Sequence, residues 1–243
     1  MPSVLITGAS RGIGLELVRQ YARSGWQVIA TARNPGKAAS LAALARQNSN
    51  ISVHALDVCD RNQALALNER LGATSIDVLL HNAGVAPGTT QQSTFGSLDH
   101  AVFRQALDTN VWAVLSLTEV LVERVAHSAL RKVMVMSSAV GSVSSVAMFD
   151  SINGGGYLYR ISKAALNMAV SLMAKDLAPR GVTVGLLSPG QVDTELGGGH
   201  VGTPASQVIS PETSVAGLIP VIAAFSLSNT GKFFGYTGAE VPW

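Results

Sequence analysis

The feature that most restricts how this chain can fold lies near its start, where a short apolar run leads directly into a glycine-rich turn. Val4-Leu5-Ile6 is typical of a strand buried on both faces of a sheet. Gly8-Ala9-Ser10-Arg11-Gly12-Ile13-Gly14 follows, and a helical pattern then continues to Gly25. Together they predict a phosphate cradle, because backbone N–H groups and the positive end of the helix dipole face the same anion. A glycine turn without a ligand is the alternative, but its position between a strand and a helix favours the cradle.

The rest of the chain repeats this alternation of strands and helices without a polar linker. Further strands are predicted at residues 26–31, 51–56, 76–80, 131–136, 182–187 and 233–236. Helices are predicted at residues 37–46, 62–71 and 98–126, around Tyr159 as far as Pro179, and from Pro211 onward. We therefore predict a single doubly wound α/β domain of the Rossmann type over residues 1–243, with helices on both faces of a parallel sheet of about seven strands.

Charged residues are scarce in this chain and evenly mixed in sign. They make up 13% of it, against roughly 25% in an average soluble domain, so much of the chain must be buried in its own core or against other subunits. Lys+Arg 17 and Asp+Glu 15 give a net charge of +2, and the basic residues form no stripe or cluster. This pattern argues against nucleic-acid binding.

The apolar segments and the cysteine content argue against other classes of protein. The longest apolar run, residues 215–225, is broken by Pro220 and is shorter than the roughly 20 residues of a membrane helix. No signal-peptide pattern precedes the first strand. The single cysteine, Cys59, excludes an internal disulfide, and no Cys/His cluster indicates a metal site. We therefore expect a cytoplasmic protein with no metal and no membrane partner.

The residues after the second predicted strand indicate which dinucleotide the cradle would hold. An acidic residue at this position suits a free ribose 2′-hydroxyl, whereas an arginine suits a 2′-phosphate. The chain has Arg33 here and no acid, with Arg11 in the glycine turn as a possible second partner. Arg33 could instead be a solvated loop charge, but a planar guanidinium is the favoured partner of phosphate. We therefore expect NADP(H) in preference to NAD(H).

A tyrosine and a lysine four residues apart supply candidate chemistry. In Tyr159-Arg160-Ile161-Ser162-Lys163 the phenol and the ammonium lie on the same face of a helix. A cation near a phenol lowers the phenol pKa from about 10, which would let Tyr159 exchange a proton with a carbonyl or alcohol oxygen. Alone, the pair could also be an ordinary surface pair. Asn110 lies among apolar neighbours and needs hydrogen-bond partners, as a structural tie between strands, a catalytic residue or both.

Five motifs occur in a characteristic order: Thr7-Gly8-x-x-x-Gly12-x-Gly14, Asn82-Ala83-Gly84, Ser138, Tyr159-x-x-x-Lys163 and Pro189-Gly190-x-Val192-x-Thr194. Together they make the sequence closely resemble the short-chain dehydrogenase/reductases over essentially its whole length. The resemblance implies that Ser138 hydrogen-bonds the substrate oxygen and that Tyr159 exchanges its proton with that oxygen. It implies that Lys163 lowers the pKa of Tyr159 and binds the nicotinamide ribose, and that Asn110 holds a water linking Lys163 to solvent.

The resemblance also implies the set of cofactor-binding residues. Asp57 and Val58 match the adenine-contacting positions, and the motif after the sixth strand matches the nicotinamide end. The full set comprises Gly8, Ser10, Arg11, Gly12, Ile13, Gly14, Arg33, Asp57, Val58, Asn82, Ala83, Gly84, Tyr159, Lys163, Pro189, Gly190, Val192 and Thr194.

Several details are similar to the C-factor and sniffer-type carbonyl reductase branch of the family. These are residues 154–167, 194–198 and 238–243, and a long loop between Ser138 and Tyr159. Two positions depart from the pattern. His81 stands where the family usually has asparagine, and Gln191 stands where close relatives often have an aromatic residue.

The leading hypothesis is an NADPH-dependent reductase of aldehydes, ketones or quinone-like carbonyls. The alternative is a nucleotide-binding regulatory or signalling protein of the C-factor type with little turnover. The intact set of Asn110, Ser138, Tyr159 and Lys163 favours the enzyme, because a sensor needs no proton donor.

The loops that would set the substrate, residues 84–97, 140–156 and 197–210, contain no arginine or lysine. We therefore expect a small uncharged carbonyl or alcohol substrate. Members of the family usually pair through the helices that hold Asn110 and Tyr159, so a homodimer or homotetramer is expected. The long loop before Tyr159 could block one such face.

Overall fold

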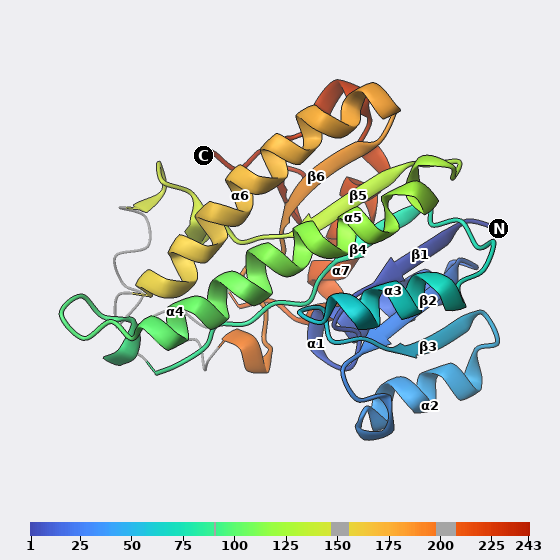
Figure 1. Cartoon of the computed structure of the whole chain (residues 1–243), viewed down its shortest axis with the longest axis horizontal. Coiled ribbons are helices and arrows are strands. Elements are labelled where there is room, and N and C mark those ends of the chain that lie inside the picture. Colours follow the sequence, from blue (N-terminus) through green and yellow to red (C-terminus); the bar gives the residue numbers. More distant parts are fainter. Residues whose placement is uncertain (90, 147–155, 198–207) are drawn as a thin grey trace.

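The computed structural model describes residues 1–89, 91–146, 156–197 and 208–243. Seven strands form one sheet in the order β3-β2-β1-β4-β5-β6-β7, and every neighbouring pair is parallel (Figure 1). The strands are β1 (Ser3–Ile6), β2 (Gln27–Ala32), β3 (Ile51–Ala55), β4 (Val78–His81), β5 (Lys132–Met136), β6 (Thr183–Ser188) and β7 (Phe233–Gly235). The predicted doubly wound α/β fold is confirmed.

Helices cover both faces of this sheet. They are α1 (Gly12–Arg23), α2 (Ala39–Gln47), α3 (Arg61–Arg70), α4 (His100–Leu107), α5 (Ala113–Ala126), α6 (Tyr157–Leu177) and α7 (Pro211–Ala224). The buried side chains of α1, α2 and α7 form one core cluster, and those of α3, α5 and α6 form the other. α4 precedes α5 and packs against α6. Among the described residues, no helix is both long and apolar enough to cross a membrane.

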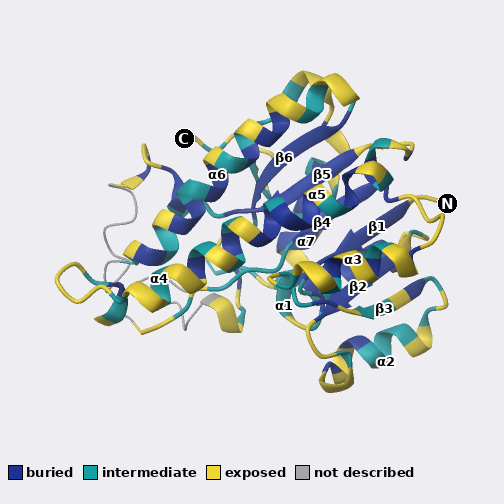
Figure 2. Ribbon diagram, in the orientation of Figure 1, coloured by how far each residue is buried: buried dark blue, intermediate teal, exposed yellow. Residues whose placement is uncertain are grey.

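The central strand β1 shows why the strands of this chain are continuous apolar runs. Val4 and Ile6 belong to the core under α1 and α7, whereas Leu5 belongs to the core under α3 and α5, and all three are fully buried. Successive side chains of a strand point to opposite faces, so a sheet covered on both sides needs an apolar residue at every position. Burial of each such side chain contributes about 1.5–3 kcal/mol, and Figure 2 shows the buried strands between exposed outer helix faces.

The long helical stretch predicted over residues 98–126 is confirmed, with one irregularity that was not predicted. α4 ends at Leu107, a π-helical turn spans Asp108–Trp112, and α5 begins at Ala113. The chain is therefore helical from His100 to Ala126, with a π-helical turn in the middle. The turn holds Asn110 facing inward, where its side chain bonds to the backbone of Val85 and to Ser162. Single π-helical turns often occur at functional sites.

The other predicted elements differ from the structure only at their ends. The helix predicted from residue 37 begins at Ala39, because a 3₁₀ turn at Pro35–Lys37 comes first. The strand predicted over residues 76–80 lies at Val78–His81. Such end shifts are small, and they leave the strand ends that carry the candidate site where the sequence places them.

Candidate active site

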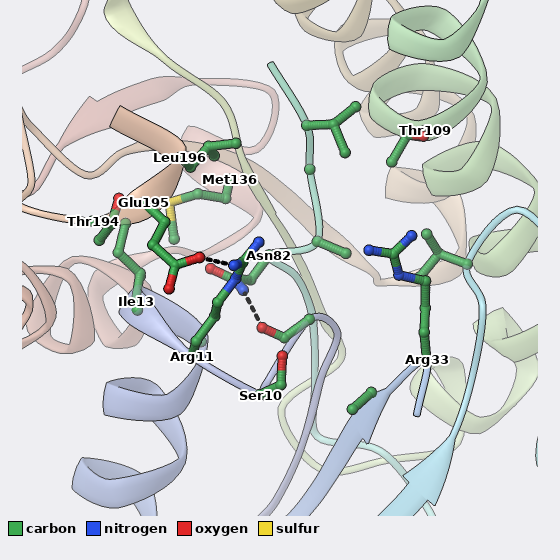
Figure 3. A pocket seen from close by; sticks show the side chains of 18 of the residues that line it. Ser10, Arg11, Ile13, Arg33, Asn82, Thr109, Met136, Thr194, Glu195 and Leu196 are labelled. Atoms are coloured by element: carbon green, nitrogen blue, oxygen red, sulfur yellow. Dashed lines mark hydrogen bonds and ion pairs between the residues drawn. The ribbon is translucent and has the colours of Figure 1, made fainter. Parts of the chain in front are cut away.

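The carboxyl ends of β1 and β4 meet where the strand order reverses, which is where ligands bind in open α/β sheets. The Thr7 hydroxyl accepts hydrogen bonds from the backbone N–H groups of Asn82 and Ala83, both at 3.0 Å. The side-chain amide of Asn82 donates to the Thr7 carbonyl at 2.9 Å. These bonds hold the two strand ends together beside a cavity of about 990 Å³ (Figure 3).

Two glycines leave bare backbone on the floor of this cavity. A Cβ atom at Gly14 would lie 2.2 Å from the carbonyl oxygen of Gly8 and 2.6 Å from Nδ2 of Asn82, so no side chain fits there. Gly8 has a φ of +66°, and a Cβ atom there would lie 2.9 Å from Cα of Ala83. Glycine permits both the left-handed conformation and the close approach.

The first turn of α1 has backbone N–H groups that no side chain caps. Its N-cap residue, Arg11, makes no capping hydrogen bond, and no acidic residue lies in the first turn. By contrast, α3, α4 and α7 are capped by Asp60, Asp99 and Ser210. The N–H groups and dipole of α1 are therefore available to an anion. This uncapped helix start and the glycine floor fit the pyrophosphate of a dinucleotide.

Tyr159, Lys163 and Ser138 lie together where α6 meets the end of β5. Ser138 is close enough to the Tyr159 hydroxyl to lower the pKa of the phenol. Nζ of Lys163 donates to the carbonyl oxygen of Met136 at 3.0 Å and lies 5.7 Å from the centre of the Tyr159 ring. Tyr159 and Lys163 both line the cavity. The structure thus brings the predicted tyrosine, lysine and serine into one group.

Burial shifts the ionisation of both residues on α6. It raises the pKa of Tyr159 to about 12, while the neighbouring Ser138 acts in the opposite direction. Burial also lowers the pKa of Lys163 to about 8. The net pKa shift of Tyr159 is therefore upward, opposite to the fall predicted from the sequence, because loss of solvation dominates. Tyr159 is a neutral phenol at neutral pH and so holds a proton to donate.

Asn110 uses every polar atom of its side chain. Its Oδ1 accepts from the Val85 N–H at 2.8 Å, and its Nδ2 donates to the Val85 carbonyl and to the Ser162 hydroxyl, both at 2.9 Å. Ser162 in turn donates to the Tyr159 carbonyl at 2.7 Å. Asn110 therefore ties the segment after β4 to α6, a structural role that joins a loop to a helix and not two strands as predicted. The water that it would hold stays a prediction.

A second cavity of about 460 Å³ shares Arg11 and Arg33 with the first. None of the residues that line it is acidic. They are Ser10, Arg11, Arg33, Lys37, Ala38, Ala39 and Ser40. The start of α2, which no side chain caps, contributes its positive end. Within the described part of the chain, neither Arg33 nor Lys37 has an ion-pair partner. The charge of this cavity suits a phosphate group.

Most of the predicted cofactor-binding residues line the main cavity. They are Gly8, Ser10, Arg11, Gly12, Ile13, Gly14, Arg33, Asp57, Val58, Asn82, Ala83, Gly84, Tyr159, Lys163, Pro189 and Thr194. Gly190 and Val192 do not line it. A Cβ atom at Gly190 would lie 2.8 Å from the ring of Tyr236, and Val192 is buried in a β-bridge with Ile209. These two residues shape the turn after β6.

Parts of the predicted substrate-binding loops lie outside the described residues. These parts are position 90, residues 147–155 and residues 198–207. They include the start of the 154–167 segment and the end of the 194–198 segment that carried the resemblance to the carbonyl reductase branch.

The cavity also has wall residues that the sequence analysis did not select, namely Ala32, Leu56, Cys59, Val85, Ala101, Arg104, Gln105, Asp108, Thr109, Met136, Ser137, Asp193, Glu195, Leu196 and Pro211. The wall residues around α4 could have been predicted, because Ala101, Gln105 and Asp108 are spaced so that they lie on one side of a helix. Lys37 of the second cavity could have been predicted in the same way, because it follows Arg33 by four positions. Among the described residues, no three His, Cys, Asp or Glu side chains are grouped to hold a metal ion.

A family profile matches most of this chain, and other proteins are similar to it over long stretches. The profile described as short chain dehydrogenase matches residues 2–201. C-signal of Myxococcus xanthus is 38% identical over 168 residues, which cover 69% of this chain and 93% of that protein. The 1-hydroxy-2-glutathionyl-2-methyl-3-butene dehydrogenase of Rhodococcus sp. (strain AD45) is 34% identical over 246 residues, which cover 100% of both chains.

Solved structures of carbonyl reductases have the same fold. The NADPH-bound carbonyl reductase from chicken fatty liver superimposes with a TM-score of 0.90 at 28% identity, covering 100% of this chain and 99% of that one. The carbonyl reductase Sniffer of D. melanogaster has a TM-score of 0.86 at 28% identity and covers 100% of both chains. These similarities confirm the resemblance inferred from the motifs, including its branch.

Proposed function

Because this chain belongs to the short-chain dehydrogenase/reductase family, we propose that it is an NADPH-dependent oxidoreductase that reduces the carbonyl group of an aldehyde, ketone or quinone-like compound to an alcohol. The observation that supports this most directly is the grouping of Tyr159 with Ser138 and Lys163 at the end of β5. The group borders a cavity whose glycine floor and uncapped helix start fit a dinucleotide. A protein that only binds a nucleotide needs no proton donor at this place.

Each side chain has a defined part in the proposed reaction. NADPH, when bound, supplies the hydride that the carbonyl carbon gains. The carbonyl oxygen accepts a hydrogen bond from Ser138 and gains the proton of the Tyr159 phenol, which completes the alcohol. Because the pKa of Tyr159 is raised to about 12, the phenol is protonated at neutral pH, which favours reduction over alcohol oxidation. Lys163 is a cation below its pKa of about 8, and it stabilises the negative charge left on Tyr159.

The preference for NADPH over NADH is proposed from the second cavity. Arg33 and Lys37 lie there without an ion-pair partner among the described residues, beside the uncapped start of α2. A 2′-phosphate would make charge-assisted hydrogen bonds with these side chains, whereas a free 2′-hydroxyl would leave the two cations close together and uncompensated. The NADPH-bound chicken carbonyl reductase is consistent with this choice.

Two classes of substrate are considered for the proposed reductase. The absence of arginine and lysine from residues 84–97, 140–156 and 197–210 supports a small uncharged carbonyl compound. The Rhodococcus relative, by its name, acts on a hydroxy compound conjugated to glutathione. Arg104 lines the main cavity from α4, outside the three loops, and is a possible partner for a carboxylate of such a conjugate. We favour the uncharged class, because Asp108 lines the same wall and would oppose an anion.

A regulatory or signalling role with little turnover is the second candidate. The 38% identity to C-signal favours it. The two roles make opposite demands on Tyr159, because a nucleotide-binding regulator tolerates loss of the phenol, whereas a reductase does not.

We further propose that the protein forms a homodimer or homotetramer through α5 and α6. Ile161, Met168 and Leu172 lie along one side of α6 and are exposed, as is Trp112 just before α5. Exposed apolar side chains at regular spacing on one helix suit an interface between copies of the chain. Sedimentation of the wild type and of Met168→Glu distinguishes a dimer that this change disrupts from a monomer that it leaves unaltered.

The test of the proposed function is the oxidation of NADPH by aldehydes, ketones and quinones, measured as a loss of absorbance. A glutathione-conjugated alcohol is tested in the reverse direction with NADP⁺, measured as a gain of absorbance. Tyr159→Phe should lower the rate by at least about a hundredfold. Tyr157→Phe is the matched control, because it removes an exposed phenol two positions earlier on the same helix. NADPH binding without turnover of any compound would support the regulatory role, and failure to bind either nicotinamide cofactor would refute both.

A further inference from the structure

Arg11 borders two cavities at once, and its charge is already paired. It lines the main cavity and the smaller basic one beside Arg33. Its guanidinium forms an ion pair with Glu195, which lies 184 positions later in a 3₁₀ turn, Glu195–Gly197, after β6 (Figure 3). The pair therefore joins two parts of the main cavity lining that are far apart in the sequence. In Figure 3 the Arg11 side chain extends toward Glu195, and Arg33 lies on the far side of the opening.

The basic cavity is the alternative place for the Arg11 guanidinium. Its other cationic side chains, Arg33 and Lys37, have no carboxylate partner among the described residues, and no acidic residue lines it. An anion bound there would attract a third cation, because Arg11 also lines this space. Arg11 thus has two competing partners, which are the carboxylate of Glu195 and whatever phosphate enters the basic cavity.

The strengths of the two interactions decide which partner prevails. The side chains of Arg11 and Glu195 are 65% and 72% exposed, so solvent screens their attraction. Exposed pairs of this kind change an equilibrium by roughly fivefold at most. An arginine–phosphate contact is charge-assisted and can be bidentate, so it is the stronger of the two. A phosphate would therefore displace Glu195, but it would have to overcome the existing pair.

We propose that Glu195 is a specificity-determining residue: it competes with the 2′-phosphate of NADPH for Arg11 and thereby reduces the preference of the protein for NADPH over NADH. The inference rests on the proposed function, because it assumes that a nicotinamide dinucleotide occupies the main cavity. It concerns only dinucleotides that carry a 2′-phosphate. NADH offers no competing anion at this position, so the pair is unaffected by its binding.

The test is a double-mutant cycle on cofactor binding, measured by fluorescence titration with NADPH and with NADH. Glu195→Gln should tighten NADPH binding by about two- to fivefold and leave NADH binding unchanged. Arg11→Gln should weaken NADPH binding, and Glu195→Gln should then have no further effect in the Arg11→Gln background. Glu240→Gln is the matched control, since it removes the carboxylate of another exposed pair, with Lys232, whose residues line neither cavity.

Three results would overturn the inference. They are an unchanged NADPH affinity in Glu195→Gln, an equal change for both cofactors, and weaker NADPH binding. The last two would indicate that Glu195 holds the turn after β6 over the cofactor instead of competing for Arg11. If the wild type binds neither cofactor, the proposed function itself has failed, and this outcome is distinct because it appears before any variant is compared. Equal thermal unfolding of Glu195→Gln and wild type checks that the fold is intact.

Discussion

The ammonium of Lys163 lies 5.7 Å from the centre of the Tyr159 ring, and Lys163 is buried and Tyr159 half-buried in the wall of one cavity. Burial disfavours the charged form of each group, so it shifts the two pKa values in opposite directions, up for the phenol and down for the amine. The amine, and not the phenol, is therefore the member of the pair that titrates nearest to neutral pH.

The rate of carbonyl reduction should fall as pH rises through about 8. Tyr159 keeps its proton up to a pKa of about 12, whereas Lys163 loses its charge around pH 8 and then no longer stabilises the developing phenolate. The measurement is kcat/KM for reduction from about pH 6 to about pH 10. Lys163→Arg, which stays charged, should move the decline to higher pH, and Lys175→Arg on the exposed side of α6 should leave it in place. A profile that is flat through pH 8 would contradict this assignment.

Replacement of Asn110 by alanine should destabilise the fold by about 3 kcal/mol, because it leaves buried polar groups without partners. The groups concerned are the N–H and carbonyl of Val85 and the hydroxyl of Ser162. The free energy of unfolding in urea measures the effect. Asn62→Ala is the control, since that asparagine is exposed on α3. Equal stability of the two variants would show that the contacts of Asn110 are not structural.

Gly14→Ala should abolish tight binding of NADPH. The added Cβ would lie 2.2 Å from the Gly8 carbonyl oxygen, so the glycine turn would have to move away from the end of β4. Gly235→Ala on β7 is a fair control, because its Cβ would meet nothing closer than 3.7 Å. Titration of both variants with NADPH checks the prediction, and circular dichroism separates lost binding from lost fold. Near wild-type affinity in Gly14→Ala would mean that the cradle does not hold the cofactor.

The parts of the site that could be predicted from sequence are those set by local spacing. The glycine turn before α1 and the pair Tyr159–Lys163 depend on neighbours only a few positions away, so their geometry follows from helix and turn rules. The pairing of Arg11 with Glu195 could not be predicted, because 184 positions separate the two and only the strand order β1-β4-β5-β6 of the folded sheet brings them together.

Two features that differ from the sequence analysis have similar physical origins. The π-helical turn at Asp108–Trp112 was not predicted, because local sequence does not show the hydrogen bonds of Asn110 to the distant Val85. The pKa of Tyr159 was predicted to fall because the sequence shows the nearby cation, whereas burial depends on the whole fold. Both depend on contacts between distant parts of the chain.

His81 should make the protein less stable as pH falls from 7 to 5. The Thr118 hydroxyl donates to the Val114 carbonyl at 2.7 Å, so its oxygen accepts from Nε2–H of His81 at 2.9 Å, and the ring is neutral. Burial lowers its pKa to about 3 from an ordinary value of 6.5. Between these values the unfolded chain binds the proton and the folded chain does not, so the stability contribution is complete above pH 6.5 and is lost progressively below it.

The expected size of this effect is about 2 kcal/mol between pH 7 and pH 5. His81→Asn introduces the residue that the family usually has at this position and removes the titrating group. The free energy of unfolding of this variant should therefore decline less than that of the wild type over the same interval, by about that amount. His127→Asn, which replaces an exposed histidine at the end of α5, should follow the wild type. Parallel declines in wild type and His81→Asn would show that His81 takes up its proton in the folded protein as readily as in the unfolded chain.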